Sequence, residues 1–525
     1  LVAGAAAAPF LRSESRAAAR DVRRSVAVLG FRDLAGRGDT GWLSEALTEM
    51  LGAELAAGET LRTIPAQSVR RAKAEMPPGS LEALDRETLG RLRENLGADV
   101  VVHGNYLAPG SGPSSGLRVD VRMQDTATGE TLATVTESRS VASLLDLVSA
   151  AGGRLRSRLG AHPLSEVQGR SVRAALPTDP GAARLYAEGL AALARFDLFE
   201  ARRLFEESLG IEPGHALTHS ALAETFSALG LEAEAEAAAR RAFETSSPLD
   251  REGRLLVEGR FHEASFRWSE ASETYGVLFG FFPDDLEHGL RLLRAQTRLA
   301  DPKRAAATLA SLRASPYFAS DDPRIDLAEA DVADSRSDFR RALASAEAAA
   351  RKGSERGAKL LVAEALLRQS RAQLLLGLYD RSEQSAKEAR SIFLRLRHPV
   401  GVLDAEQRIG LSLFAFGRLE EAIAHYQAGL RKAREAGSRA HEFSNLEGLG
   451  ETYVQSGDVA AAEKSRRAAL EGAQALGNRR MTAVAEANLA AVLDLRGELS
   501  AAREGYGNSR RLFEEIGDFW RAAAL

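Results

Sequence analysis

The sequence predicts a small α/β domain followed by an all-α solenoid, and two observations carry this prediction. Short apolar runs rich in valine alternate with helical patterns before residue 160. Further on, glycines recur every forty residues in two interleaved series: Gly377, Gly417, Gly457 and Gly497, and Gly437, Gly477 and Gly517. A fixed period of this length is typical of stacked helix pairs, which bury their apolar faces only against their neighbours.

The composition is that of a globular protein with more than one domain. The chain has 525 residues, of which 45% are hydrophobic and 27% are charged, and this length is too great for a single core. A net charge of −4, from 69 basic and 73 acidic residues, gives no general attraction to nucleic acid. We therefore expect no nucleic-acid partner. The absence of cysteine excludes disulfides, thiolate metal sites and cysteine nucleophiles.

Residues 1–24 are interpreted as a juxtamembrane or linker segment. Leu1–Leu11 is apolar but shorter than the ~20 residues that a spanning helix needs. It fits the end of a membrane helix or signal segment, or else a loose alanine-rich terminus. The arginines that follow would favour a cytoplasmic position for the rest of the chain if a membrane helix ended here.

Residues 25–160 are expected to form the α/β domain. Apolar β-branched runs predict its strands, and leucines on one face predict its helices. The expected strands are Ser25–Phe31, Leu61–Ile64, Val100–Val102, Leu117–Met123 and Thr131–Thr136, and the expected helices are Gly41–Ala57, Asp85–Leu96 and Ser143–Leu159. Thr128 and Gly129 form the turn of a hairpin. The glycine-rich loop 109–116 lacks a following Gly-Lys-Ser/Thr, which excludes a phosphate-binding loop.

A linker, residues 161–183, leads into repeats of 34 residues over 184–356. The first copy contains Tyr186, Gly189, Ala201, Phe205 and Pro213, and the third repeats its spacing with Gly259, Ala271, Tyr275 and Pro283. Small residues allow the two helices to cross closely, an aromatic ring fills the space between them, and proline ends the second helix. We count about five copies, of which those over 286–356 are degenerate.

From residue 357 to 525 the period is forty, which gives about four copies. Six extra residues lengthen each helix of a pair by about one turn of ~3.6 residues. Arg466 occupies the position that Tyr426 has one copy earlier, and we predict that it extends along the helix to reach water. Gly517–Leu525 aligns with Gly437–Asn445, and the chain begins with leucine, so we expect a fragment at both ends.

The sequence carries no pattern typical of catalysis. It has no Gly-x-Ser-x-Gly motif and no kinase signature, so we expect no enzyme, no cofactor and no metal in these residues. His215 and His219 lie four residues apart and could face the same way on a helix. They could bind a metal or form a partly exposed structural pair, and the structural pair is favoured because no third ligand accompanies them.

The binding candidates lie on the first helix of each pair, which lines the concave side of such an array. Polar side chains there have no packing role and are free to hold a partner. The repeat frame places these residues inward: Arg368, Arg371, Gln407, Arg408, Glu447, Glu451 and Asn488. The three arginines could form a basic patch for an acidic peptide or a carboxylate terminus, or they could be ordinary solvated side chains.

Two resemblances follow from these motifs. Residues 184–517 resemble tetratricopeptide repeats, which implies a right-handed superhelical solenoid that binds a protein or peptide in its groove. Residues 25–139 resemble the domain related to the amino-terminal domain of TolB, through SVAVLGF, the helix that starts at Trp42, LGADVVVHGNYL and LRVDVRMQDTATGETLA.

Together the resemblances imply the non-catalytic sensory region of a bacterial membrane-anchored signalling protein, associated with a serine/threonine kinase. The extracytoplasmic side of the membrane is preferred by the resemblance, and the cytoplasmic side is left open. Two alternatives remain: a periplasmic scaffold or assembly factor, and the effector region of a transcriptional regulator or adenylate cyclase.

Overall fold

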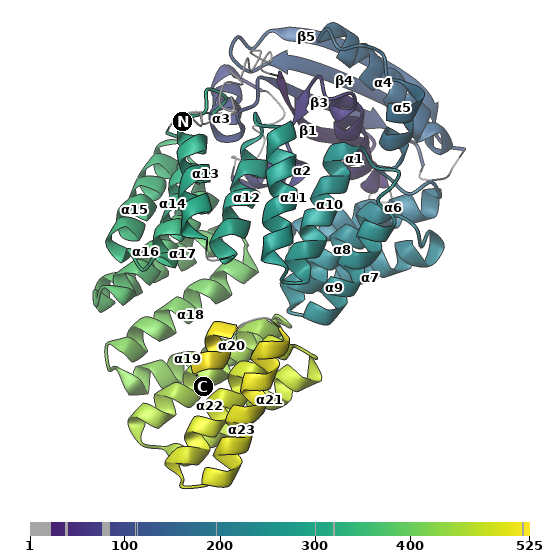
Figure 1. Ribbon diagram of the computed structural model, residues 1–525. Coiled ribbons are helices and arrows are strands. Elements are labelled where there is room, and N and C mark those ends of the chain that lie inside the picture. The colour runs from purple at the N-terminus through teal and green to yellow at the C-terminus, as the bar shows by residue number, and fades with distance from the viewer. Residues whose placement is uncertain are drawn as a thin grey trace, which may run out of the picture.

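The computed structural model describes residues 23–36, 40–75, 84–110, 112, 114–195, 197–299, 301–318, 321–516 and 519–524. A five-stranded sheet with its helices comes first in the chain, and a long curved array of helix pairs follows (Figure 1). The expected fold class, a small mixed-sheet domain before a helical solenoid, is confirmed.

The sheet has the strand order β2-β1-β3-β4-β5. Strand β1 (Ser25–Asp33) runs parallel to β2 (Arg62–Thr63) and to β3 (Val100–Leu107). The remaining two strands, β4 (Gly116–Asp125) and β5 (Thr131–Ser140), are antiparallel to their neighbours, which confirms the predicted hairpin.

Helices cover both faces of the sheet because side chains of a strand alternate between its faces. Val26 and Val28 pack in one core with α1 (Trp42–Ala56) and α4 (Leu144–Arg158), whereas Ala27 and Leu29 pack in a second core. The second core belongs to α2 (Ala66–Glu75) and α3 (Arg86–Leu96). Helix α2 was not predicted, because most of its side chains are polar.

The helical array begins after a short helix, α5 (Glu166–Arg173), in the segment expected as a linker. The shorter helices are α6 (Pro180–Ala194), α7 (Leu198–Ile211), α8 (Ala216–Leu229), α9 (Glu232–Glu244), α10 (Arg251–Ala264), α11 (Trp268–Phe281), α12 (Leu286–Arg298), α13 (Pro302–Ala314) and α14 (Pro323–Ser335). The longer helices are α15 (Phe339–Glu355), α16 (Lys359–Leu375), α17 (Tyr379–Arg395), α18 (Pro399–Ala415), α19 (Leu419–Glu435), α20 (Arg439–Ser456), α21 (Val459–Ala475), α22 (Arg479–Leu495) and α23 (Leu499–Glu515), and α24 (Phe519–Ala524) follows.

Helix length changes as the repeat period predicts. Helix α8 has 14 residues and α9 has 13, whereas α16 and α17 have 17 each. The recurring glycines end these helices in the left-handed conformation, with φ of +76° at Gly377 and +81° at Gly417. Glycine adopts this conformation without the steric cost that a Cβ would bring.

A small residue on the first helix of a pair faces a large residue on the second helix. An added Cβ on Gly410 would collide with the ring of Tyr426, and one on Gly259 would collide with Tyr275. Both rings are buried. This close approach explains the spacing of small and aromatic residues seen in the sequence.

The first helices of the pairs, α6 to α22 with even numbers, lie on the inner side of the array. Successive first helices contact one another from α6 to α10 and from α12 to α22. In the described part of the chain, no two successive second helices pack as closely. The array therefore curves with its first helices on the concave wall, as the sequence frame predicts.

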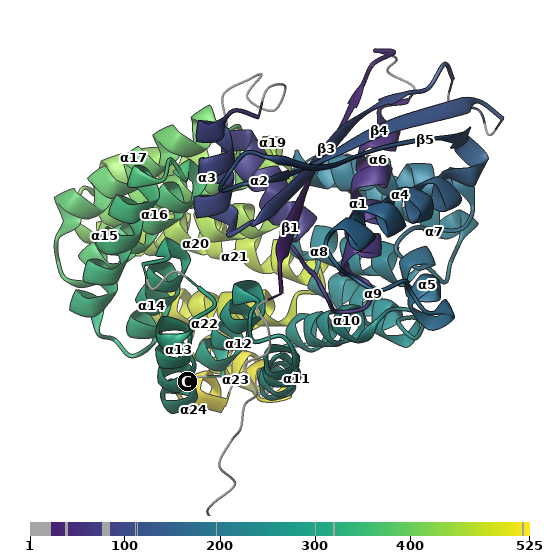
Figure 2. The same ribbon diagram turned by 90° about the horizontal axis from the view of Figure 1, so that it is seen from above.

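The array curves far enough for distant parts of the chain to meet (Figure 2). The α/β domain packs on it through α1 against α6, and Arg23 forms an ion pair of 2.5 Å with Asp284. Further along, the guanidinium of Arg480 lies 5.1 Å from the centre of the Phe266 ring. An early and a late segment of the array are thus in contact.

The expected membrane-anchored location is corrected. Among the described residues, no helix combines the length and the apolar character needed to cross a bilayer. The expectation rested on Leu1–Leu11, which lies outside the described residues.

Candidate functional site on the concave wall

Ion pairs between neighbouring first helices hold two of the predicted arginines. Arg368 of α16 donates to Asp331 of α14 through Nε (3.0 Å) and Nη2 (3.2 Å). One turn further along, Nε of Arg371 lies 2.9 Å from Asp334. These carboxylates neutralise both arginines and link α14 to α16.

Arg408 of α18 lies beside these two arginines and differs from them. It is half-buried, and its guanidinium makes no hydrogen bond or ion pair with another described residue. Burial and the positive charge of Arg371 lower the pKa of Arg408, while the charges of Asp404 and Asp334 act in the opposite direction. The guanidinium remains charged at neutral pH. Asp404 of the same helix could neutralise it but is bonded to His441, 3.0 Å away.

The structure therefore brings Arg368, Arg371 and Arg408 together and leaves Arg408 without a hydrogen-bonded carboxylate. We call these three residues the basic cluster. Gln407 is the neighbour of Arg408 in the chain and is also half-buried.

The other three predicted residues surround Arg466, whose position differs from the one expected. Glu447 and Glu451 of α20 form ion pairs with Arg466 of α21, and Asn488 of α22 donates to Glu447. The prediction that Arg466 reaches water is wrong, because this residue is only 3% exposed. It fills the slot of Tyr426 and packs against Gly450, while the two carboxylates compensate its buried charge. We call Arg466, Glu447, Glu451 and Asn488 the acidic cluster.

The partners of the inward side chains were missed, although the sequence contains a signal for them. Arg368 and Asp331 are 37 residues apart, as are Arg371 and Asp334, and as are His441 and Asp404. A separation one helical turn shorter than the forty-residue period places opposite charges on adjacent first helices. Searching for charge pairs at this spacing would have found all three.

His215 and His219 have structural roles. His215 is buried and caps α8 by accepting from the backbone N–H of Thr218, and burial lowers its pKa to about 4. His219 contacts the carbonyl oxygen of Pro213 through Nε2 at 2.9 Å. The two rings are thus engaged with different backbone groups, and His215 is buried rather than partly exposed as expected.

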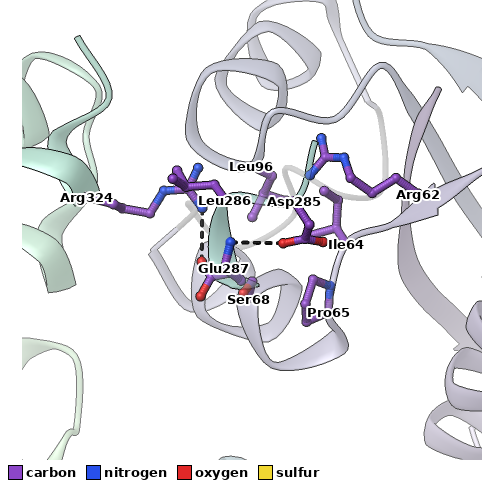
Figure 3. Close-up of a pocket in the computed structure, with 9 residues that line it drawn as sticks. All are labelled: Arg62, Ile64, Pro65, Ser68, Leu96, Asp285, Leu286, Glu287 and Arg324. Carbon is purple, nitrogen blue, oxygen red and sulfur yellow. Dashed lines mark hydrogen bonds and ion pairs between the residues drawn. The ribbon is translucent and has the colours of Figure 1, made fainter. Parts of the chain in front are cut away.

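A small pocket lies at the seam between the α/β domain and the array (Figure 3). Arg62, Ile64, Pro65, Ser68 and Leu96 line it from the domain, and Asp285, Leu286, Glu287 and Arg324 line it from the array. Figure 3 shows Arg324 turned toward Glu287, with which it forms an ion pair of 3.1 Å.

No family model and no curated protein sequence matches the chain. Parts of it are similar to three solved structures: a Rap protein complexed with competence and sporulation factor (16% identity, TM-score 0.40, 51% of this chain and 77% of that chain), the apo form of RapI (13%, 0.37, 64% and 98%), and NprR in complex with its cognate peptide NprX (16%, 0.36, 49% and 81%). These likenesses concern the helical fold alone. The relation of residues 25–139 to the TolB domain stays a prediction.

Proposed function

We propose that the chain is a non-catalytic interaction region that binds an acidic peptide or protein segment on its concave wall. The free guanidinium of Arg408 carries this proposal. A cation that is half-buried beside two further arginines, and that has no carboxylate hydrogen-bonded to it, favours a ligand that brings a carboxylate. Charge-assisted hydrogen bonds to such a group are among the strongest available.

The neighbours of Arg408 support the same ligand chemistry. Arg368 and Arg371 are held in place by Asp331 and Asp334, so their positions are fixed before a ligand arrives. A preorganised site loses less conformational entropy on binding than a mobile one. Gln407 adds a side-chain amide that can donate to the same segment.

A sensory role in bacterial signalling agrees with the resemblance of the two parts of the chain to domains found together in such proteins. The association with a serine/threonine kinase stays a prediction, since it concerns residues outside this chain.

Binding of a labelled hexaglutamate peptide, measured by fluorescence anisotropy, tests the proposal. We expect Arg408→Gln to weaken this binding ~10-fold or more, because a hydrogen bond to a charged group contributes about 1.5–3 kcal/mol. Arg431→Gln is the matched control, since Arg431 is exposed on the second helix α19. Equal loss in both variants, or no loss in Arg408→Gln, would contradict the proposal.

A further inference from the structure

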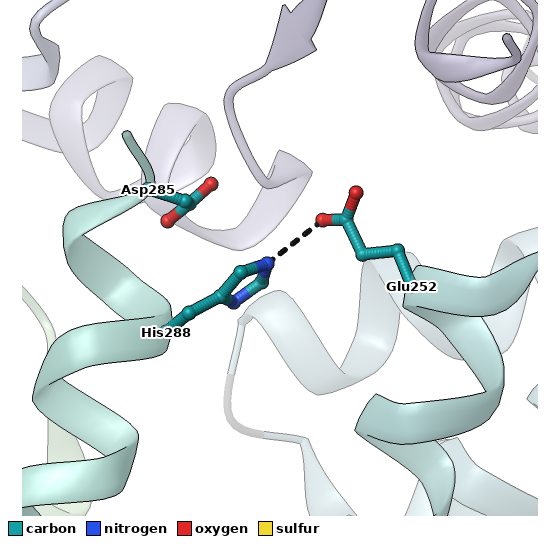
Figure 4. A group of neighbouring side chains, drawn as sticks. All are labelled: Glu252, Asp285 and His288. Carbon is teal, nitrogen blue, oxygen red and sulfur yellow. Dashed lines mark hydrogen bonds and ion pairs between the residues drawn. The ribbon is translucent and has the colours of Figure 1, made fainter. Parts of the chain in front are cut away.

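A second cluster of polar side chains lies where the α/β domain meets the array, away from the basic cluster. Glu252 comes from the first turn of α10, Asp285 is the residue before α12, and His288 follows in the first turn of that helix. One donor atom from each of the three residues lies within 4.8 Å of the other two. Figure 4 shows His288 turned toward Glu252, with the carboxylate of Asp285 beside the ring.

The cluster is buried more deeply than a solvated charge group. Asp285 and His288 are each 3% exposed, and Glu252 alone remains in partial contact with solvent, at 31% of its side chain. The Nε2 atom of His288 lies 3.0 Å from Glu252, whereas its Nδ1 atom is buried without a hydrogen-bond partner. The imidazole is therefore not satisfied by the protein alone.

The local charge leaves room for a divalent cation. Arg23 binds Asp284 through two hydrogen bonds of 2.7 and 2.5 Å, so this pair is neutral. Asp285 and Glu252 bring two negative charges to one imidazole, while Arg23, Arg291 and Arg324 lie within electrostatic range of the cluster without forming an ion pair with either carboxylate.

Two other histidine–carboxylate pairs in the array show what distinguishes this one. Glu406 contacts His425 but also Lys432 and Arg390, so both of its carboxylate oxygens are already paired with cations. His441 contacts a single carboxylate, Asp404, and a hydroxyl, that of Ser438. Only the cluster at His288 combines an imidazole with two carboxylates among the described residues.

We propose that Glu252, Asp285 and His288 form a binding site for a divalent transition metal, with Zn²⁺ as the best match. Zinc accepts imidazole nitrogen and carboxylate oxygen together, whereas Mg²⁺ prefers oxygen alone. Two carboxylates neutralise the ion, and water reaching Glu252 completes the coordination. The bound ion joins α10 to α12 beside the Arg23–Asp284 pair, so it would also strengthen the seam. This inference is independent of the peptide site.

Isothermal titration of the untagged chain with ZnCl₂ tests the site. We expect one Zn²⁺ per chain and a rise in melting temperature, with no response to MgCl₂. His288→Ala, Glu252→Gln and Asp285→Asn should each weaken zinc binding at least ~10-fold, the lower range for disturbed metal sites. Asparagine keeps the helix cap that Asp285 gives to α12, so Asp285→Asn retains the fold.

His441→Ala is the matched control, because it removes a buried histidine from the array without touching the cluster. It should leave zinc binding unchanged. The proposal is overturned if the wild-type chain binds no zinc, if His441→Ala loses as much affinity as His288→Ala, or if MgCl₂ competes equally with zinc. Wild-type affinity in Asp285→Asn and Glu252→Gln would also overturn it.

Discussion

The basic cluster and the acidic cluster lie on the same concave wall, yet their central arginines differ completely. Arg408 has two cations beside it and no bonded anion, whereas Arg466 has two carboxylates and is buried. The repeat frame puts Arg408 on a first helix and Arg466 on a second one. The comparison teaches that neighbours on adjacent helices decide whether an arginine stabilises the array or stays available to a partner.

The largest expected effect is on stability at Arg466. Arg466→Ala should lower the free energy of unfolding by about 3–5 kcal/mol, since it leaves Glu447 buried and uncompensated. Arg408→Ala should change it by less than about 0.5 kcal/mol, because no bonded partner is lost. Urea unfolding of both variants checks this contrast. Equal destabilisation would mean that Arg408 is a structural residue and would remove the basis for the peptide site.

A smaller effect is expected at Glu406, a buried carboxylate on the same helix as Arg408. Burial acts to raise the pKa of Glu406, but hydrogen bonds from His425 and Lys432 lower it to about 2. Because the folded-state pKa lies below the unfolded value of 4.5, its contribution is fully present above that pH and is lost as the pH falls toward about 2.

Glu406→Gln should therefore cost about 2–3 kcal/mol at pH 7, from a pKa shift at 1.36 kcal/mol per unit with allowance for coupling. The difference between wild type and variant should shrink on acidification from pH 5 to pH 3, as measured by thermal unfolding. A difference that stays constant over this range would contradict the assigned ion pairs. A difference that shrinks as expected would show that the charge of Glu406 stabilises the fold, unlike the charge of Arg408.

The smallest effect is expected at the partly exposed pair of Arg371 and Asp334, whose side chains are 45% and 25% exposed. Asp334→Asn should cost about 0.2–1 kcal/mol, and the cost should fall in 0.5 M salt. Urea unfolding at low salt and in 0.5 M salt measures this cost. A cost that does not fall with salt would contradict the assigned ion pair.

Most of the fold followed from residues that obey simple periodicities. The glycines that recur every forty residues predicted the longer helices. Asp85 and Gly97 lie at the two ends of α3. Thr128 and Gly129 predicted the turn between β4 and β5. Helix α2 was not predicted because most of its side chains are polar and its apolar face is narrow. Its existence depends on packing of Val69 and Ala72 against β1, which is a tertiary effect.

The candidate site was only half predictable. The repeat frame identified the inward residues, but it could not say which of them are already bonded. Arg466 illustrates the limit, since the general cost of burying a charge argued for exposure. Glu447 and Glu451 reverse that argument, and they lie on a different helix. The zinc proposal likewise depends on the packing of α10 beside α12, which brings Glu252 close to His288 and cannot be predicted from the local sequence.

The contact between an early and a late segment of the array has a consequence for how the chain unfolds. Open repeat arrays contain contacts only between adjacent units, so they can lose their ends first and melt in stages. Here Arg480 stacks on Phe266, and the ring of Phe199 packs on Gly437. Such contacts between remote segments tie early and late helices into one cooperative unit and slow its assembly.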